Sequence, residues 1–262
     1  MKPVICFEPL YSDRAPGEKI AHIARLGFQY VEFWGWRDKD IPAILEACDK
    51  YHVTVANFSG HRGGSPVSEN THQLLLQDLA EAVTVAQTLG CHILMMLTNA
   101  LNEDGSVTDS FEQIPECEKY ENTIMALYKA LDSTPEGINL VLEPLNTLVD
   151  HPGYFLKDIA TASSLIRDIG SQRLKILCDL YHLGVMGNDL EQVITDFLPD
   201  IGYFHVADFP GRHEPGSGSA DWTSLLTLIK DSGYTGYVGF EYFPEKDADE
   251  SLLKIKKLWE SI

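Results

Sequence analysis

The sequence predicts an α/β fold, a single (β/α)8 TIM barrel that extends over residues 1–262. Eight short apolar segments alternate with helical patterns, and no linker or second domain interrupts the alternation. The longer loops, rich in Gly, Pro or polar residues, follow the strand segments, whereas helix-to-strand connections such as Leu26–Gly27 are short. Because the functional loops of a parallel barrel lie at the carboxyl ends of its strands, this asymmetry predicts the face that carries a site.

The strand segments are apolar runs rich in Ile, Leu, Val, Phe and Tyr, as expected for parallel strands buried on both faces. In chain order the expected strands are Pro3–Phe7, Tyr30–Trp34, Val53–Phe58, Cys91–Leu97, Ile138–Glu143, Leu174–Asp179, Ile201–His205 and Tyr237–Glu241. An open, doubly wound sheet is the alternative arrangement. It is disfavoured because no G-x-G-x-x-G motif follows the first strand.

The clearest helical pattern is Asn70–Leu89, where apolar residues recur at helical spacing and Gly90 is well placed to end the helix. After the fourth to eighth strands we expect helices over Phe111–Ser133, Tyr154–Ile169, Asp189–Phe197, Trp222–Ser232 and Glu250–Glu260. Each strand is therefore followed by enough chain for one helix and two loops.

Composition narrows the class of protein. The formal net charge of −19 argues against a nucleic-acid partner, whose binding depends on Lys and Arg neutralising phosphates. No run of 18 apolar residues occurs and the chain starts directly in a strand, so neither a membrane span nor a secretory signal is expected. The five cysteines are scattered, which predicts a cytoplasmic location. Self-association into a homo-oligomer is left open.

Four successive strand segments end in residues that bind divalent metals: Glu143, Asp179, His205 and Glu241. Each alone is as readily a helix cap. As a set they predict one metal site, because a parallel barrel brings its strand ends to one rim. Three carboxylates and one imidazole suit Mn²⁺, Mg²⁺ or Co²⁺, with Zn²⁺ as a further option.

Three motifs carry a resemblance to a known family. They are E-P-x-N-T at Glu143–Thr147, D-x-Y-H at Asp179–His182, and A-D-x-P-G-R-H-x-P-G-x-G at Ala207–Gly218. Together they resemble the xylose-isomerase-like TIM-barrel superfamily, most nearly its hydroxypyruvate isomerase and 2-oxo-tetronate isomerase members. The resemblance implies the same four metal ligands, and it implies that Glu143 and Glu241 are the catalytic proton donor and acceptor.

The chemistry of such an isomerase fits these residue types. Moving a carbonyl to the neighbouring carbon means removing a proton next to it and returning that proton one carbon away, through an enediolate. A divalent ion stabilises the negative charge on oxygen, and two carboxylates serve as acid and base. We therefore predict a metal-assisted aldose–ketose type isomerase of a small hydroxy-keto acid, with hydroxypyruvate to tartronate semialdehyde as the model reaction.

Other activities share the scaffold. His205 stands where many hydroxypyruvate isomerases carry Gln, which favours a ketose 3-epimerase of the tagatose or psicose type acting on a ketose. An inosose dehydratase-like lyase uses the same proton abstraction. An abasic-site endonuclease needs more histidines and a basic face, which the charge of −19 disfavours. The loop Thr147–Phe155 departs from the usual form of the family, so we expect it to set substrate specificity.

Five further residues are candidate substrate contacts. His182 is placed to donate a hydrogen bond to a substrate oxygen or to hold a carboxylate. Arg212 suits a two-point grip on a substrate carboxylate, with a salt bridge to Glu214 as the structural alternative. Trp34 is expected to wall the pocket. Glu8 and His61 complete the set as strand-end and loop residues near the same rim.

Overall fold

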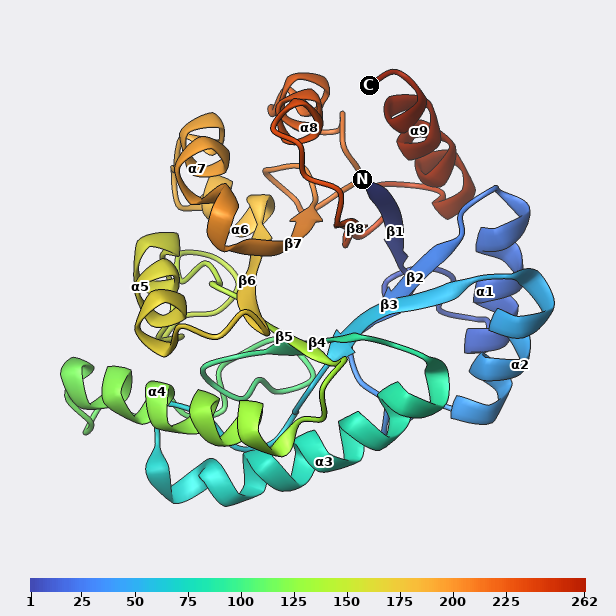
Figure 1. Ribbon diagram of the computed structural model, residues 1–262. Helices are drawn as coiled ribbons and strands as arrows, with labels where there is room; N and C mark the ends of the chain where they lie inside the picture. Colours follow the sequence, from blue (N-terminus) through green and yellow to red (C-terminus); the bar gives the residue numbers. More distant parts are fainter.

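The computed structural model describes residues 1–262 as a closed barrel of eight strands (Figure 1). Every neighbouring pair is parallel, and the last strand pairs with the first. The strands are β1 Lys2–Cys6, β2 Tyr30–Phe33, β3 Thr54–Ser59, β4 Ile93–Met96, β5 Asn139–Leu142, β6 Leu174–Asp179, β7 Ile201–Val206 and β8 Tyr237–Phe240. The predicted (β/α)8 barrel is confirmed.

Helices form a ring outside the strands (Figure 1). They are α1 Pro16–Arg25, α2 Ile41–Tyr51, α3 His72–Leu89, α4 Glu116–Ser133, α5 Ile159–Ile169, α6 Leu180–Val185, α7 Leu190–Phe197, α8 Trp222–Asp231 and α9 Ala248–Glu260, with 3-10 turns at Glu69–Thr71 and Leu198–Asp200. Helix α3 ends at Leu89 as predicted, because Gly90 adopts the left-handed conformation of a C-cap, with φ of 64°. None of the helices combines the length and the apolar character that crossing a bilayer requires.

Two helices begin five residues later than the sequence predicts. Helix α4 starts at Glu116 rather than Phe111, since Pro115 disfavours helical backbone in the residue before it. Helix α5 starts at Ile159 rather than Tyr154, because the side chain of Asp158 accepts a hydrogen bond from the backbone N–H of Thr161 and caps the helix there. In both cases the displaced residues lengthen a loop at the carboxyl rim of the barrel.

The short helix α6 was not predicted. Asp179 is both the last residue of β6 and the N-cap of α6, and its Oδ1 accepts a hydrogen bond of 2.8 Å from the N–H of Tyr181. The capping bond uses Oδ1, and Oδ2 lies 3.5 Å from the guanidinium of Arg212. The first residues of α6 therefore hold Asp179 in a fixed orientation at the rim, and they carry His182 to the same place.

The loop between β3 and α3 is held by one buried carboxylate. Asp78 of α3, 2 % exposed, accepts hydrogen bonds from the backbone N–H groups of Arg62 and Gly63, at 2.9 and 2.6 Å. Arg37 supplies the opposing charge at 2.7 Å. Burial favours the neutral acid, yet Arg37 and the two N–H donors hold the pKa of Asp78 below its usual value. The loop is thus fixed to the helix that follows it.

Replacing Asp78 by Asn removes this charge and should lower the free energy of unfolding by about 1–3 kcal/mol, the range for a hydrogen-bonded buried charge. Urea denaturation measures the change. Glu81→Gln is the matched control, because Glu81 binds the same Arg37 from an exposed position and should cost less than about 1 kcal/mol. Equal losses in the two variants would show that Asp78 does not hold the loop.

Candidate active site

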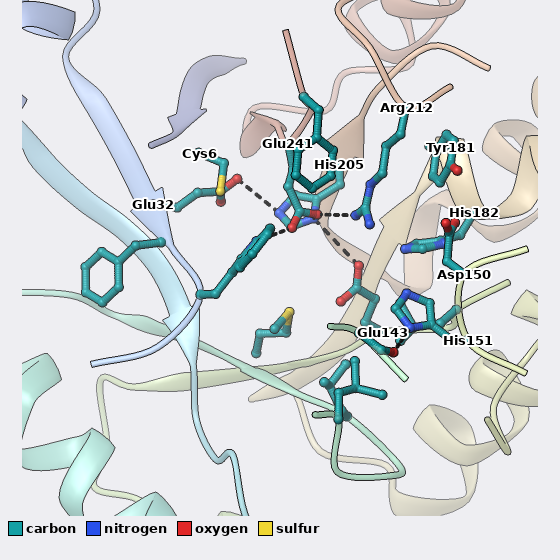
Figure 2. A pocket seen from close by; sticks show the side chains of 18 of the residues that line it. Cys6, Glu32, Glu143, Asp150, His151, Tyr181, His182, His205, Arg212 and Glu241 are labelled. Atoms are coloured by element: carbon teal, nitrogen blue, oxygen red, sulfur yellow. Dashed lines mark hydrogen bonds and ion pairs between the residues drawn. The ribbon is translucent and has the colours of Figure 1, made fainter. Parts of the chain in front are cut away.

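The four predicted metal ligands meet at the carboxyl rim of the barrel. Glu143 directly follows β5, Asp179 ends β6, His205 lies in β7 and Glu241 directly follows β8. All four side chains are buried, and one ligand atom from each lies within 4.8 Å of the others. Figure 2 shows His205 with Glu32 on one side and Arg212 on the other. The barrel therefore brings together residues that span about a hundred positions of sequence.

The cluster fits a divalent ion. Glu143 Oε1 and His205 Nδ1 are buried without a hydrogen-bond partner, which is unusual for polar atoms away from water. His205 Nδ1 lies 3.2 Å from Glu241 Oε2 and 3.6 Å from Glu143 Oε1. An ion among these atoms would satisfy them, and the set of three oxygens and one nitrogen suits Mn²⁺, Mg²⁺ or Co²⁺.

The environments of the carboxylates differ. Burial raises the pKa of Glu143 to about 7 and that of Asp179 to about 6. Burial acts on Glu241 in the same direction, but the charge of Arg212 and the bond to His205 hold the pKa of Glu241 well below its usual value. The pKa of His205 is raised despite burial, first by the charge of Glu32. Glu143 is consequently the carboxylate that binds a proton most readily.

Glu32 is a site residue that the sequence analysis missed. It lies in β2, 2 % exposed, with Oε1 at 3.2 Å from His205 Nε2 and Oε2 accepting a hydrogen bond of 2.5 Å from the hydroxyl of Tyr203. Gly239 makes room for this pair, since a Cβ there would collide with Glu32 Oε1 and lie 2.7 Å from His205 Cδ2. With Nε2 facing Glu32, Nδ1 is the nitrogen that faces the cluster. The only available signal was an acidic residue inside an apolar strand.

Arg212 and Trp34 both hold Glu241. The guanidinium of Arg212 lies 2.7 Å from Glu241 Oε2 and 3.5 Å from Asp179 Oδ2, and it stacks over the ring of Tyr181. The indole N–H of Trp34 donates to Glu241 Oε1. The alternative pairing of Arg212 with Glu214 does not occur, because Glu214 pairs with Lys254. Arg212 therefore lies against the proposed metal ligands themselves.

His182 is oriented by Asn146. The side-chain amide of Asn146 donates to His182 Nδ1 at 2.7 Å, so the neutral imidazole carries its proton on Nε2. Nε2 is buried without a hydrogen-bond partner and lies 3.5 Å from Asp179 Oδ2. Burial holds the pKa of His182 well below its usual value. His182 thus presents an N–H donor beside the predicted metal ligands.

A cavity of about 650 Å³ opens beside the cluster. Glu143, His205 and Glu241 form part of its wall, together with Trp34, His182 and Arg212.

The predicted specificity loop, Thr147–Phe155, contributes Val149, Asp150 and His151 to the cavity wall. His151 Nδ1 donates to the carbonyl of Gly105 at 2.7 Å, which ties this loop to the loop after β4. Residues of both loops line the cavity.

Glu8 and His61 do not line this cavity, in contrast to the expectation from the sequence. Glu8 accepts a hydrogen bond from the backbone N–H of Trp34 and pairs with Lys39 at 3.0 Å. The ring of His61, 1 % exposed, accepts from the N–H of Leu97 at 3.1 Å. Both residues accept hydrogen bonds from backbone N–H groups behind the cavity wall. The sequence pattern does not distinguish this role from contact with a substrate.

Comparison with known proteins gives a consistent family. The model of the family described as xylose isomerase-like TIM barrel matches residues 20–258. A putative hydroxypyruvate isomerase of Mus musculus is 33% identical over 254 residues, which cover 93% of this chain and 89% of the relative. The hydroxypyruvate isomerase of Escherichia coli strain K12 is 30% identical over 237 residues, which cover 87% of this chain and 88% of the relative.

Solved structures show the same architecture. A structure described as AP endonuclease, family 2 from Brucella melitensis superposes with a TM-score of 0.86 at 25% identity, over 98% of both chains. A D-psicose 3-epimerase superposes with a TM-score of 0.77 at 20% identity, over all of this chain and 95% of the other. At that identity the second likeness shows the fold alone.

Glu32→Gln should weaken Mn²⁺ binding about 10–100-fold, because partners that orient a ligating histidine have effects of this size. Calorimetric titration of the metal-free protein measures the affinity. Tyr203→Phe should give a smaller loss of the same kind, whereas Glu81→Gln, the same change far from the cavity, should give none. Wild-type affinity in Glu32→Gln would exclude Glu32 from the metal site.

The affinity for the metal should fall as the pH decreases from about 8 to 6. Ligands bind metal in their deprotonated form, and below the pKa values of about 7 for Glu143 and about 6 for Asp179 the ion must displace protons. The raised pKa of His205 acts in the same direction. Titrations in buffers of different ionisation enthalpy should therefore detect proton release. An affinity that is constant over this range would contradict the raised pKa values.

Proposed function

Because this chain belongs to the xylose isomerase-like TIM barrel family and is an isomerase of that fold, we propose that it interconverts small hydroxy-keto acids, as in hydroxypyruvate to tartronate semialdehyde, with the aid of one divalent ion. The observation that carries the proposal is the pair Glu143 and Glu241 in one buried cluster with Asp179 and His205. The curated relatives named above as hydroxypyruvate isomerases support the substrate class.

Glu143, Asp179, His205 and Glu241 would hold the ion. When bound, a divalent ion supplies a Lewis acid that stabilises negative charge on substrate oxygens. Asp179 is the ligand with no proposed proton to move, since its Oδ1 is held by the cap of α6 and its Oδ2 faces Arg212. His205 is held by Glu32 from behind. Asp179 and His205 would keep the geometry of the metal site constant while the two glutamates exchange protons with the substrate.

We assign Glu143 and Glu241 as the proton donor and acceptor pair. They follow β5 and β8 and so approach the rim from different strands of the barrel. Burial gives Glu143 the higher affinity for a proton, whereas Arg212 and Trp34 stabilise the ionised form of Glu241. A pair of carboxylates whose environments separate their pKa values is the usual arrangement for acid–base work.

His182 and Arg212 complete the proposed site. The Nε2–H of His182 would donate to a substrate oxygen, because Asn146 occupies the other ring nitrogen. Arg212 lies close enough to Glu241 and Asp179 to contact a carboxylate attached directly to the reacting carbons. Trp34 walls the same region of the cavity. The substrate would thus meet donors and a cation at its reacting end.

A ketose 3-epimerase is the second candidate. It is favoured by His205 as the fourth ligand, and by a cavity of about 650 Å³ that accommodates a six-carbon ketose. Abasic-site cleavage is disfavoured by the charge of −19 and by Glu103, Asp104 and Asp150 in the cavity wall, which repel a nucleic-acid backbone.

One assay separates the candidates. Hydroxy-keto acids and ketoses of three to six carbons are incubated with the protein and Mn²⁺, Mg²⁺ or Co²⁺ in D₂O and followed by NMR. An isomerase moves the carbonyl and incorporates deuterium next to it, whereas an epimerase inverts one carbon and leaves the carbonyl in place. Inversion without carbonyl movement would replace the proposed reaction by the second candidate, and a lack of any exchange would overturn both.

Glu143→Gln and Glu241→Gln should each lower kcat by at least about a hundredfold, because each change keeps the size of the side chain but removes its proton-accepting oxygen. Metal content is measured in the same samples, since both residues are proposed ligands. Asp179→Asn serves as the comparison, because it removes a ligand charge without removing a proposed proton shuttle. A Gln variant with full metal and a near-normal rate would exclude that glutamate from proton transfer.

A further inference from the structure

Arg62 is the one cation of the cavity wall that has no partner for its charge. Only two Lys or Arg residues line the cavity, Arg62 and Arg212. Arg212 is already paired with Glu241 and Asp179. Arg62 is half-buried, and its guanidinium makes no hydrogen bond and no ion pair. The backbone N–H of Arg62 donates to Asp78, but this bond does not involve the side chain. A guanidinium in a cavity wall without a protein partner is available to a ligand.

The backbone that carries Arg62 is held rigidly. The carboxylate of Asp78 accepts hydrogen bonds from the backbone N–H groups of Arg62 and Gly63. On the other side, the hydroxyl of Ser59 donates to the carbonyl of His61 at 2.7 Å, and the His61 ring is fixed by the backbone of Leu97. These contacts explain why His61 is buried behind the wall. They also fix the backbone from which the Arg62 side chain extends before any ligand arrives, which lowers part of the entropy cost of binding.

Arg62 lies at the end of the cavity away from the metal ligands. It follows β3, which is opposite β7 in the closed barrel, whereas the ligands come from β5 to β8. The wall between is continuous. Trp34 contacts Glu241, and the Arg62 side chain packs next to Gly35, the residue after Trp34. A volume of about 650 Å³ far exceeds the needs of a three-carbon acid.

We propose that Arg62 binds a terminal carboxylate of the substrate, at the end of a sugar-acid chain that is longer than three carbons and whose other end lies at the metal ligands. The proposal rests on the proposed function for the reaction itself. In such a longer acid the carboxylate lies at Arg62, and Arg212 contacts another oxygen at the reacting carbons. Glu103, Asp104 and Asp150 in the same wall repel an anion, so a carboxylate needs a cation here. The planar guanidinium matches a carboxylate through two parallel hydrogen bonds.

The test compares matched ligands in the Mn²⁺-loaded protein. Gluconate and sorbitol have the same chain length and differ by a carboxylate in place of a terminal CH₂OH group, and glycerate is a three-carbon acid. Dissociation constants are measured by NMR titration for wild type, Arg62→Met and the exposed control Arg25→Met. Arg62→Gln is a second variant, in case Arg62→Met does not fold. Thermal melting confirms the fold of each variant.

Wild type should bind gluconate more tightly than sorbitol, and Arg62→Met should weaken gluconate binding about 10–100-fold while changing sorbitol and glycerate much less. Arg25→Met should match wild type. Equal losses for gluconate and sorbitol would overturn the proposal, because Arg62 would then only shape the cavity. A loss of affinity for glycerate as large as the loss for gluconate would also overturn the proposal. Tighter binding of sorbitol 6-phosphate than of gluconate would overturn it too.

The wild-type NMR assay of isomerisation separates this proposal from the proposed function. If no acid is turned over but gluconate binding depends on Arg62, the isomerase assignment fails and the carboxylate anchor stands. If acids are turned over and the preference for gluconate over sorbitol survives in Arg62→Met, the anchor fails and the isomerase assignment stands.

Discussion

Three carboxylates buried within a few ångströms of one another are the constraint on which the rest of this structure depends. Ionised groups at that spacing and out of water repel strongly, and each also loses its hydration. Positive charge must therefore be supplied at the same place. His205 and Arg212 supply part of it, from β7 and the loop after it. Glu143 Oε1 and His205 Nδ1 face the cluster without a hydrogen-bond partner, and a divalent ion bound there would supply the remaining positive charge.

The two halves of the barrel have different tasks around this cluster. Strands β5 to β8 provide the charged groups themselves. The half formed by β1 to β4 provides the residues that orient them: Glu32 from β2 holds His205, and Trp34 after the same strand holds Glu241. It also provides Arg62 at the far end of the cavity. In the proposed function, residues on opposite sides of one rim would thus carry out the chemistry and select the length of the substrate.

Loops at the rim are held by hydrogen bonds to single side chains rather than by regular structure. Asp78 fixes the loop after β3, and His151 connects the loops after β4 and β5. Asn146 accepts the N–H groups of Val149 and Asp150 while its amide orients His182. Each of these polar side chains is buried and forms hydrogen bonds, in place of water, with backbone groups that would otherwise lack a partner.

The barrel and the four cluster residues could be predicted from the sequence, because both follow from local patterns: apolar strands, helical periodicity and a ligand-type residue at each of four strand ends. The sequence did not identify Glu32, whose role depends on closure of the barrel, which brings a side chain of β2 against His205 of β7 in the interior. Nor did it separate His61 and Glu8, which serve the backbone, from Arg62, which faces the cavity. Which way a polar side chain points at a strand end is decided by tertiary contacts, since neighbouring loop positions carry the same residue types whether they face ligand or backbone.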